Sequence, residues 1–226
     1  IKRNMEEKEN STIKNNEENF EFHSDWLAPH LPYWEKHLYH LANQEINVLE
    51  IGAFEGRSTT WILQELCKNP LSKMITIDTF EKIFKEIDNE PIFHENVRKT
   101  GKERQIEIIK GRSYDSLIEL NQSKKMMFDF VYIDGSHIAC DVLSDAVLSW
   151  NLVKEGGIMI LDDYQWDFYK DEHNNPTIAI DAFLKCFRWQ IEILDRYYQI
   201  IIRKVTRENV LTVAEGKDWR EFLKHG

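Results

Sequence analysis

The chain has 226 residues, of which 42% are hydrophobic, and a formal net charge of −10 at pH 7. This length and hydrophobic share suffice for one α/β domain with a sizeable core, whereas the acidic balance disfavours nucleic acid as a partner, because phosphate binding needs clustered Lys and Arg. No apolar run approaches the roughly 20 residues of a membrane span, and the first residues lack the apolar core of a signal peptide, which favours a cytoplasmic protein that does not bind membranes.

The chain begins with a polar stretch followed by a helical segment. Residues 1–25 are rich in Lys, Glu, Asn and Ser and predict a polar tail. Residues 26–45 carry Trp and Leu side chains at helical spacing, interrupted by Pro29 and Pro32, and predict one or two short helices. Residues 206–226 are expected to form a C-terminal tail, with a final short helix at 217–224.

Residues 46–205 alternate between strand and helix patterns and predict a single domain. Strands are expected at 46–51, 73–78, 105–110, 128–134 and 157–161, and helices at 56–67, 114–121, 140–153 and 177–187. A charged helical stretch is expected after the second strand and ends at about residue 99. Such alternation is typical of a parallel sheet with right-handed crossovers. The last two strands, 190–194 and 198–204, are too close together for a helical crossover, so they predict an antiparallel hairpin.

The first strand runs into a glycine-bearing turn and then a helix. Residues 48–60 read Val-Leu-Glu-Ile-Gly-Ala-Phe-Glu-Gly-Arg-Ser-Thr-Thr. Gly52 and Gly56 let a ligand approach the backbone closely, because glycine has no Cβ. The helix that follows directs free N–H groups toward an anion. This stretch therefore predicts a site for a nucleotide-like cofactor.

Polar or small residues follow five of the strands, at the sheet edge where ligands collect in open α/β folds. Asp78, 26 residues after Gly52, is placed to accept hydrogen bonds from both hydroxyls of a ribose. Ser58 and its helix N-terminus can hold a carboxylate, and Thr79 and Ser113 would flank an adenine. The alternative for Asp78 and Ser58 is that they cap a turn or a helix.

Three carboxylates and one histidine form a second group of candidates. Asp134, Asp162 and Asp163 would repel one another unless a cation neutralised them, and an all-oxygen set suits Mg²⁺. His137 titrates near neutral pH and is a candidate general base. The alternatives are that one of Asp162 and Asp163 caps a turn, that Asp134 faces only the cofactor, and that His137 is a surface residue. The other seven histidines have no comparable setting.

These blocks resemble the class I S-adenosylmethionine-dependent methyltransferases, in the group that contains macrocin O-methyltransferase and cephalosporin hydroxylase-like proteins. The resemblance covers about residues 46–205, and its motifs are residues 48–59, 76–78, 111–113, 128–137 and 145–166. It implies a Rossmann-like sheet of seven strands in the order 3-2-1-4-5-7-6. Strand 7 would be antiparallel, with helices on both faces and an N-terminal helical extension.

The resemblance also implies roles for individual residues. Those expected around S-adenosylmethionine are Glu50, Gly52, Ala53, Phe54, Ser58, Asp78, Thr79, Gly111, Ser113 and Asp134. Phe54 stands where many relatives have a further glycine, and its ring is expected to cover the methionine part. Metal-dependent members bind Mg²⁺ through acids that match Asp134, Asp162 and Asp163. The similar catechol O-methyltransferase has a lysine as base at the position of His137, so that the catalytic residues here would be His137 and Asp134.

We therefore expect an O-methyltransferase that acts on a hydroxyl of a small molecule or glycan with the help of Mg²⁺. Flat aromatic side chains are candidates for the acceptor wall or, alternatively, for packing of the N-terminal helices: Trp26, Tyr33, Trp34, Tyr164 and Trp166. An NAD-dependent oxidoreductase is the alternative enzyme, although the spacing of Gly52 and Gly56 departs from its motif. A non-catalytic protein that retains the fold is a third interpretation. A homodimer through the N-terminal helices is compatible with the sequence.

Overall fold

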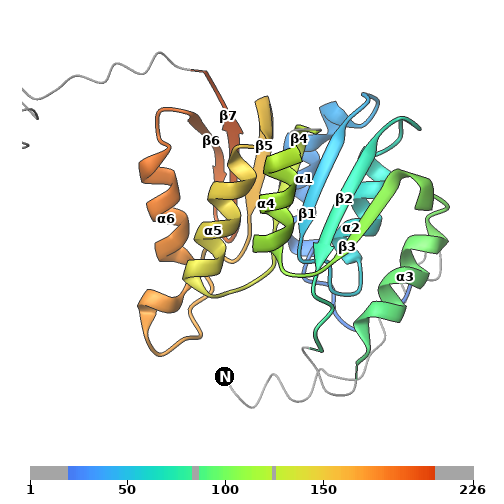
Figure 1. Ribbon diagram of the computed structural model, residues 1–226, viewed down its shortest axis with the longest axis horizontal. Helices are drawn as coiled ribbons and strands as arrows, with labels where there is room; N and C mark the ends of the chain where they lie inside the picture. The colour runs from blue at the N-terminus through green and yellow to red at the C-terminus, as the bar shows by residue number, and fades with distance from the viewer. Residues whose placement is uncertain (1–19, 83–86, 124–125, 207–226) are drawn as a thin grey trace, which may run out of the picture.

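The computed structural model describes residues 20–82, 87–123 and 126–206. A seven-stranded sheet lies between two layers of helices (Figure 1). The strands are β1 (Asn47–Ile51), β2 (Lys73–Asp78), β3 (Ile106–Lys110), β4 (Phe128–Ile133), β5 (Val153–Leu161), β6 (Ile191–Arg196) and β7 (Ile200–Lys204). The α-helices are α1 (Leu31–Leu38), α2 (Arg57–Trp61), α3 (Asn89–Lys99), α4 (Ser113–Ser123), α5 (Ala139–Trp150) and α6 (Pro176–Cys186).

The strand order is β3-β2-β1-β4-β5-β7-β6. The pairs among β1 to β5 are parallel, whereas β7 runs antiparallel to both β5 and β6. Only residues 197–199 join β6 to β7, and a parallel crossover would need a dozen residues or more. The predicted fold, its strand order and its closing hairpin are confirmed.

Alternate residues of each strand enter two separate cores. Leu49 and Ile51 of β1 face the core covered by α4, α5 and α6, whereas Val48 faces the core covered by α1, α2 and α3. The front layer of α4, α5 and α6 and the opposite placement of α1 and α2 are visible in Figure 1. Parallel sheets are covered on both faces in this way, which explains why the strand sequences are almost continuously apolar.

Two elements differ in form from those expected, whereas the other boundaries shift by at most three residues. β5 begins at Val153 rather than at residue 157, because the chain bulges at Gly156, where φ is +77°, and then resumes its pairing with β4. The helix expected at 56–67 forms as α2 followed by one π-helical turn, Ile62–Leu66, in which Cys67 N–H donates to the Ile62 carbonyl at 3.0 Å. The Lys102 ammonium donates hydrogen bonds to the carbonyls of Leu63 and Cys67 at this turn.

The N-terminal helical segment forms short helices, as predicted. Two 3₁₀ turns, Ala28–His30 and Tyr39–Leu41, flank α1, and Pro29 and Pro32 lie in the first turns of their helices, where a missing N–H costs nothing. Residues 1–19 and the helix expected at 217–224 lie outside the described residues. Among the described helices, none has the length and apolar character needed to cross a membrane.

Candidate active site

The carboxyl ends of neighbouring strands are joined to one another by backbone hydrogen bonds. The Gly52 N–H donates to the Ile77 carbonyl at 2.9 Å, and the Asp134 N–H donates to Ile51 at 2.8 Å. On either side, the Gly111 N–H donates to Asp78 at 2.9 Å and the Asp162 N–H to Ile133 at 3.0 Å. The structure therefore brings the predicted rim residues of all five parallel strands to one edge of the sheet.

The glycine turn after β1 packs backbone to backbone against the end of β4. A Cβ at Gly52, where φ is +84°, would lie 1.9 Å from the Asp134 carbonyl oxygen. Gly56 has φ +83°, and between them Phe54 has φ +50°. Left-handed backbone of this kind favours glycine and is costly for a phenylalanine. Only glycine at position 52 permits this approach of β1 to β4.

Asp78 organises this turn through its carboxylate. Its Oδ2 accepts from the N–H groups of Ala53 at 2.6 Å and Phe54 at 3.0 Å, and its Oδ1 accepts from Phe80 N–H at 2.6 Å. A carboxylate has about four acceptor positions, so Oδ1 retains one for a further donor. Asp78 is half-buried. Asp78 therefore caps the turn, as the alternative interpretation has it, and one of its acceptor positions is left for a ribose hydroxyl.

Glu50 lies beneath the turn rather than at its surface. Its fully buried carboxylate accepts hydrogen bonds from the hydroxyls of Ser58 at 2.6 Å, Thr59 at 2.5 Å and Thr76 at 3.0 Å. Burial raises the pKa of Glu50 to about 7, although these three hydroxyls act in the opposite direction. The structure therefore pairs two predicted cofactor residues, Glu50 and Ser58, with each other.

The predicted adenine side is formed by the ends of β2 and β3. Thr79 and Gly111 are half-buried, and Ser113 begins α4. Burial raises the pKa of Asp145 of α5 to about 6, although an interaction with the Ser113 side chain acts in the opposite direction. Asp145 is therefore a neighbour of the rim, which its position in the middle of a helix did not indicate.

Buried hydroxyl and amide donors hold two of the three predicted acids. Tyr132 OH lies 2.9 Å from Asp134 Oδ2 and is also hydrogen bonded to Asp162. Asp162 accepts in addition from the Gln199 amide at 2.6 Å and from the Asp163 N–H at 2.7 Å. Burial, and then the charges of the other two aspartates, raise the pKa of Asp134 well above its usual range. Burial and Asp163 raise that of Asp162 to about 6.

His137 is paired with the third acid. Its Nε2 lies 2.9 Å from Asp163 Oδ2, and Asp163 Oδ1 accepts from Tyr198 OH at 3.1 Å. Burial lowers the pKa of His137, but the hydrogen bond and the charge of Asp163 outweigh it, so that the pKa is raised. The His137 ring also packs 4.9 Å from that of Trp166. A carboxylate that holds one imidazole nitrogen leaves the other, Nδ1, for proton transfer.

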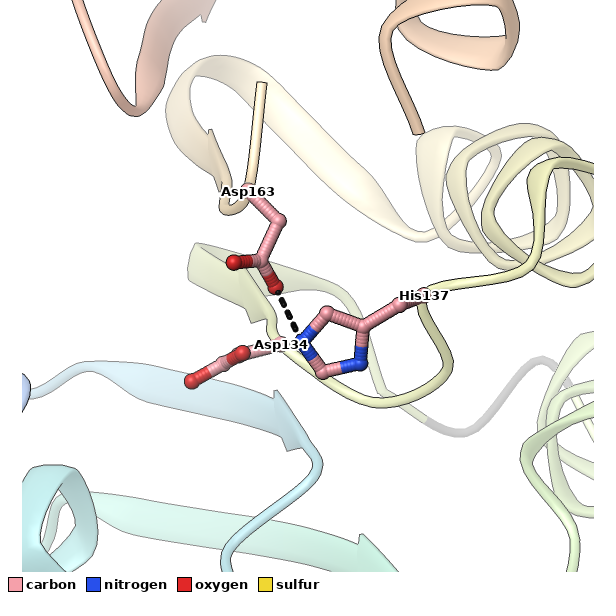
Figure 2. A group of neighbouring side chains, drawn as sticks. All are labelled: Asp134, His137 and Asp163. Atoms are coloured by element: carbon pink, nitrogen blue, oxygen red, sulfur yellow. Dashed lines mark ion pairs between the residues drawn. The ribbon is translucent and has the colours of Figure 1, made fainter. Parts of the chain in front are cut away.

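One donor atom from each of Asp134, His137 and Asp163 lies within 4.8 Å of the others (Figure 2). Two carboxylates and an imidazole suit a divalent cation, although Mg²⁺ prefers oxygen ligands. Asp162, which the sequence analysis includes as a ligand, has oxygens that already accept three hydrogen bonds. The group therefore fits a cation through Asp134 and Asp163, while a ligand role for Asp162 stays a prediction.

The sequence analysis missed residues that come from outside the strand–helix repeat. Gln199 and Tyr198 reach the acids from the turn before β7. His30, which was given no role, stacks on Tyr198 with ring centroids 5.6 Å apart, and its buried Nδ1 has no hydrogen-bond partner among the described residues. Burial lowers its pKa, against the charge of Asp163. The sequence signal that could have indicated a role for His30 is its position among the aromatic residues of the segment 26–45.

The expected aromatic residues are distributed unevenly. Trp34 is fully buried in the core, so it cannot line an acceptor pocket. Tyr164 is hydrogen bonded through its hydroxyl to Asp181, Tyr33 stacks on Tyr197, and Trp26 lies against Phe54. Trp166 is the member of the set that contacts the acid and histidine group, through His137. Trp34 therefore fits the alternative interpretation, in which these aromatic side chains pack the N-terminal helices.

Residues 49–164, just over half of the chain, match the model of the methyltransferase domain family. The chain belongs to this family. The methyltransferase is 30% identical over 92 residues to a catechol O-methyltransferase of Niastella koreensis. The aligned residues cover 41% of this chain and 38% of that protein. It is 29% identical over 133 residues to the uncharacterized protein R132 of Acanthamoeba polyphaga mimivirus, covering 57% and 58%. The matches therefore span less than two thirds of either relative.

Solved structures share the fold of this methyltransferase. MycE from the mycinamycin biosynthetic pathway, solved with Mg and SAH, superposes with a TM-score of 0.62 at 15% identity, over 89% of this chain and 56% of that one. An O-methyltransferase from Bacillus cereus, in complex with SAH, gives a TM-score of 0.60 at 21% identity, over 77% and 81%. The family and the strand order with its antiparallel β7 place the chain among the class I S-adenosylmethionine-dependent methyltransferases.

Proposed function

We propose that this chain is an O-methyltransferase that transfers the methyl group of S-adenosylmethionine to a hydroxyl of a small molecule or glycan. The observation that carries the proposal is the His137–Asp163 pair beside Asp134, whose backbone contacts Gly52 of the glycine turn. A histidine held by a carboxylate is a suitable acceptor for a hydroxyl proton. Such a base beside a cofactor turn suits the methylation of an oxygen atom.

The cofactor would lie along the sheet edge. Gly52, Ala53 and Phe54 would approach it through their backbone, and the remaining acceptor position of Asp78 would take a ribose hydroxyl. The residues that we assign to the adenine side are Thr79, Gly111 and Ser113, and Asp134 would face the sulfonium end. Glu50 and Ser58 would act from beneath, because their mutual hydrogen bond supports the turn. When bound, S-adenosylmethionine supplies a methyl group activated by the positive charge on sulfur.

His137 would remove the proton from the acceptor hydroxyl. Its Nε2 is held by Asp163, so the proton would be taken at Nδ1, and the imidazolium that forms would be stabilised by the adjacent carboxylate. Trp166 packs on this imidazole and would keep its ring in one orientation. Positioning of the oxygen in line with the methyl group would supply much of the rate.

Asp134 and Asp163, with Asp162 behind them, would hold Mg²⁺. Within the part of the chain that the structure describes, the ion pair made by these acids is that of Asp163 with His137, and the charges of Asp162 and Asp163 add to burial in raising the pKa of Asp134. A bound divalent cation would orient the acceptor hydroxyl and lower its pKa. Chelation with EDTA should therefore abolish turnover, and full activity in a metal-free preparation would retire the Mg²⁺ assignment.

Methyl transfer from labelled S-adenosylmethionine to a panel of hydroxylated sugars and phenols tests the proposal. His137→Ala should lower the single-turnover rate by about 10²-fold or more while the affinity for SAH is retained. His173→Ala is a matched control, since it removes a histidine paired with an aspartate at 2.9 Å on the exposed loop before α6. An unchanged single-turnover rate in His137→Ala would mean that the base is another residue.

A further inference from the structure

Residues 20–27, which we call the strap, lie against the glycine turn, although most of them belong to the stretch expected to be a polar tail. Phe22 of the strap is buried, and the Arg57 guanidinium lies 5.6 Å from its ring centroid. Arg57 Nε also lies 3.0 Å from Asp25 Oδ2. At the far end of the strap, the Trp26 ring packs 5.5 Å from that of Phe54 in the turn. The strap thus contacts the turn from Phe54 to Arg57.

Asn96 of α3 joins the strap to the turn. Its fully buried amide accepts from Glu21 N–H at 3.0 Å through Oδ1. Its Nδ2 donates to the carbonyls of Glu21 at 2.8 Å and Glu55 at 2.9 Å. The backbone partners determine the orientation of the amide, because an N–H can only donate and a carbonyl can only accept. One side chain therefore fastens three segments that are distant in sequence.

Glu55 makes a second attachment from the turn itself. Its carboxylate is 1% exposed and accepts from the His23 N–H at 2.7 Å, while His23 Nδ1 lies 2.6 Å from its other oxygen. A buried carboxylate without such partners is strongly destabilising. The strap and the turn consequently stabilise each other at this point.

We propose that Asn96 and Glu55 are positioning residues that fasten the strap over the cofactor turn, so that docking of the strap and binding of the cofactor reinforce each other. The inference rests on the proposed function, in which S-adenosylmethionine binds at this turn. Gly52, Phe54 and Gly56 all have left-handed backbone, and a turn of this kind binds well only if it is held in its bound conformation beforehand. The strap supplies that restraint from outside the family domain.

The variant Asn96→Asp tests the proposal. Aspartate is nearly isosteric with asparagine, but its carboxylate cannot donate to the carbonyls of Glu21 and Glu55. Calorimetry with SAH should show about a tenfold rise in Kd, and steady-state assays should show a raised KM for S-adenosylmethionine with kcat retained. Asn121→Asp is the matched control, since Asn121 Nδ2 also donates to two carbonyls, those of Leu117 and Leu148. Its Kd for SAH should not change.

Hydrogen exchange provides a readout that does not depend on activity. The backbone N–H groups of Glu21 and His23 donate to Asn96 and Glu55, so their exchange reports docking of the strap. SAH should slow exchange at both amides, because coupling between two events is reciprocal. In Asn96→Asp, exchange at Glu21 should become fast.

The outcomes separate the two proposals. If the unaltered chain does not bind SAH, both the proposed function and this inference are overturned. If it binds SAH and a folded Asn96→Asp variant binds it equally well, the inference alone is overturned. Should Asn96→Asp not fold, Phe22→Ala releases the strap from its own side and should weaken SAH binding to a similar extent. An unchanged Kd in that folded variant would likewise overturn the inference.

Discussion

At the scale of single residues, backbone strain is concentrated at the proposed site. Among the described residues other than glycine, Phe54, Phe80 and Asp163 have positive φ values of 50°, 53° and 60°. They follow β1, β2 and β5, all at the carboxyl edge of the sheet. Such conformations cost free energy and persist where the surroundings hold them, which is common at functional sites. The strain thus marks the same edge as the acids and the glycine turn.

Gly52→Ala should destabilise the fold by clearly more than the roughly 1 kcal/mol that left-handed backbone alone costs an alanine. Its Cβ would overlap the Asp134 carbonyl oxygen, and so β1 and β4 would have to separate. Gly101→Ala is the matched control, because Gly101 also has positive φ, at +67°, but nothing lies within 4 Å of its Cβ position. Urea unfolding compares the two variants. Equal losses of stability would contradict the close approach at Gly52.

At the scale of elements, a buried polar contact joins α1 to the turn between β6 and β7. Trp34 Nε1 donates to Gln199 Oε1 at 2.8 Å, and both side chains are fully buried. Because the indole can only donate, the amide nitrogen of Gln199 must face Asp162, to which it donates at 2.6 Å. The N-terminal helix therefore helps to hold an acid of the proposed site.

Trp34→Phe should lower the free energy of unfolding by about 2–4 kcal/mol, since it leaves a cavity and removes the donor to Gln199. The indole packs edge-on against Trp61, Phe130 and Tyr132, which adds to the loss. Tyr39→Phe, which removes only an exposed hydrogen bond to Glu35, should stay within about 0.5 kcal/mol. Urea titrations at one pH measure both, and similar effects would contradict a structural role for Trp34.

At the scale of the whole molecule, buried carboxyl groups make stability depend on pH. The pKa of Glu50 is raised from 4.5 to about 7 in the folded chain, and that of Asp145 from 3.8 to about 6. Between the two values of each group, the folded state binds more protons than the unfolded state. Stability contributed by these groups is therefore present at low pH and is lost as pH rises toward 7.

Glu50→Gln should remove much of this dependence, because the amide resembles the protonated acid. The unaltered chain should lose up to about 3 kcal/mol from this group as pH rises from about 4.5 to about 7. The variant should show a flatter profile and equal or greater stability above pH 7. Urea unfolding at pH 5, 6, 7 and 8 measures this, with exposed Glu107→Gln as control. A parallel profile in Glu50→Gln would show that another group is responsible.

Much of the edge could be predicted from local patterns. The strands ending at Gly52, Asp78 and Asp134 follow from apolar runs bounded by turn residues, and their convergence follows from the parallel arrangement. The pairings around them could not be predicted. That Ser58 binds Glu50 beneath the turn, and that Asp163 rather than Asp162 pairs with His137, depends on rotamers and loop conformations that no spacing encodes.

By itself, the sequence determined the parallel sheet, its closing hairpin and the edge where polar residues meet, because periodicity and connection length restrict the topology to few choices. The order of the strands followed from the family resemblance. Only the tertiary structure decided which distant segments complete that edge. Glu21 and Asn96 are separated by 75 residues, and Trp34 and Gln199 by 165. Such contacts form because packing removes these polar groups from water, so that they need partners within the protein, a condition that exists only once the chain has folded.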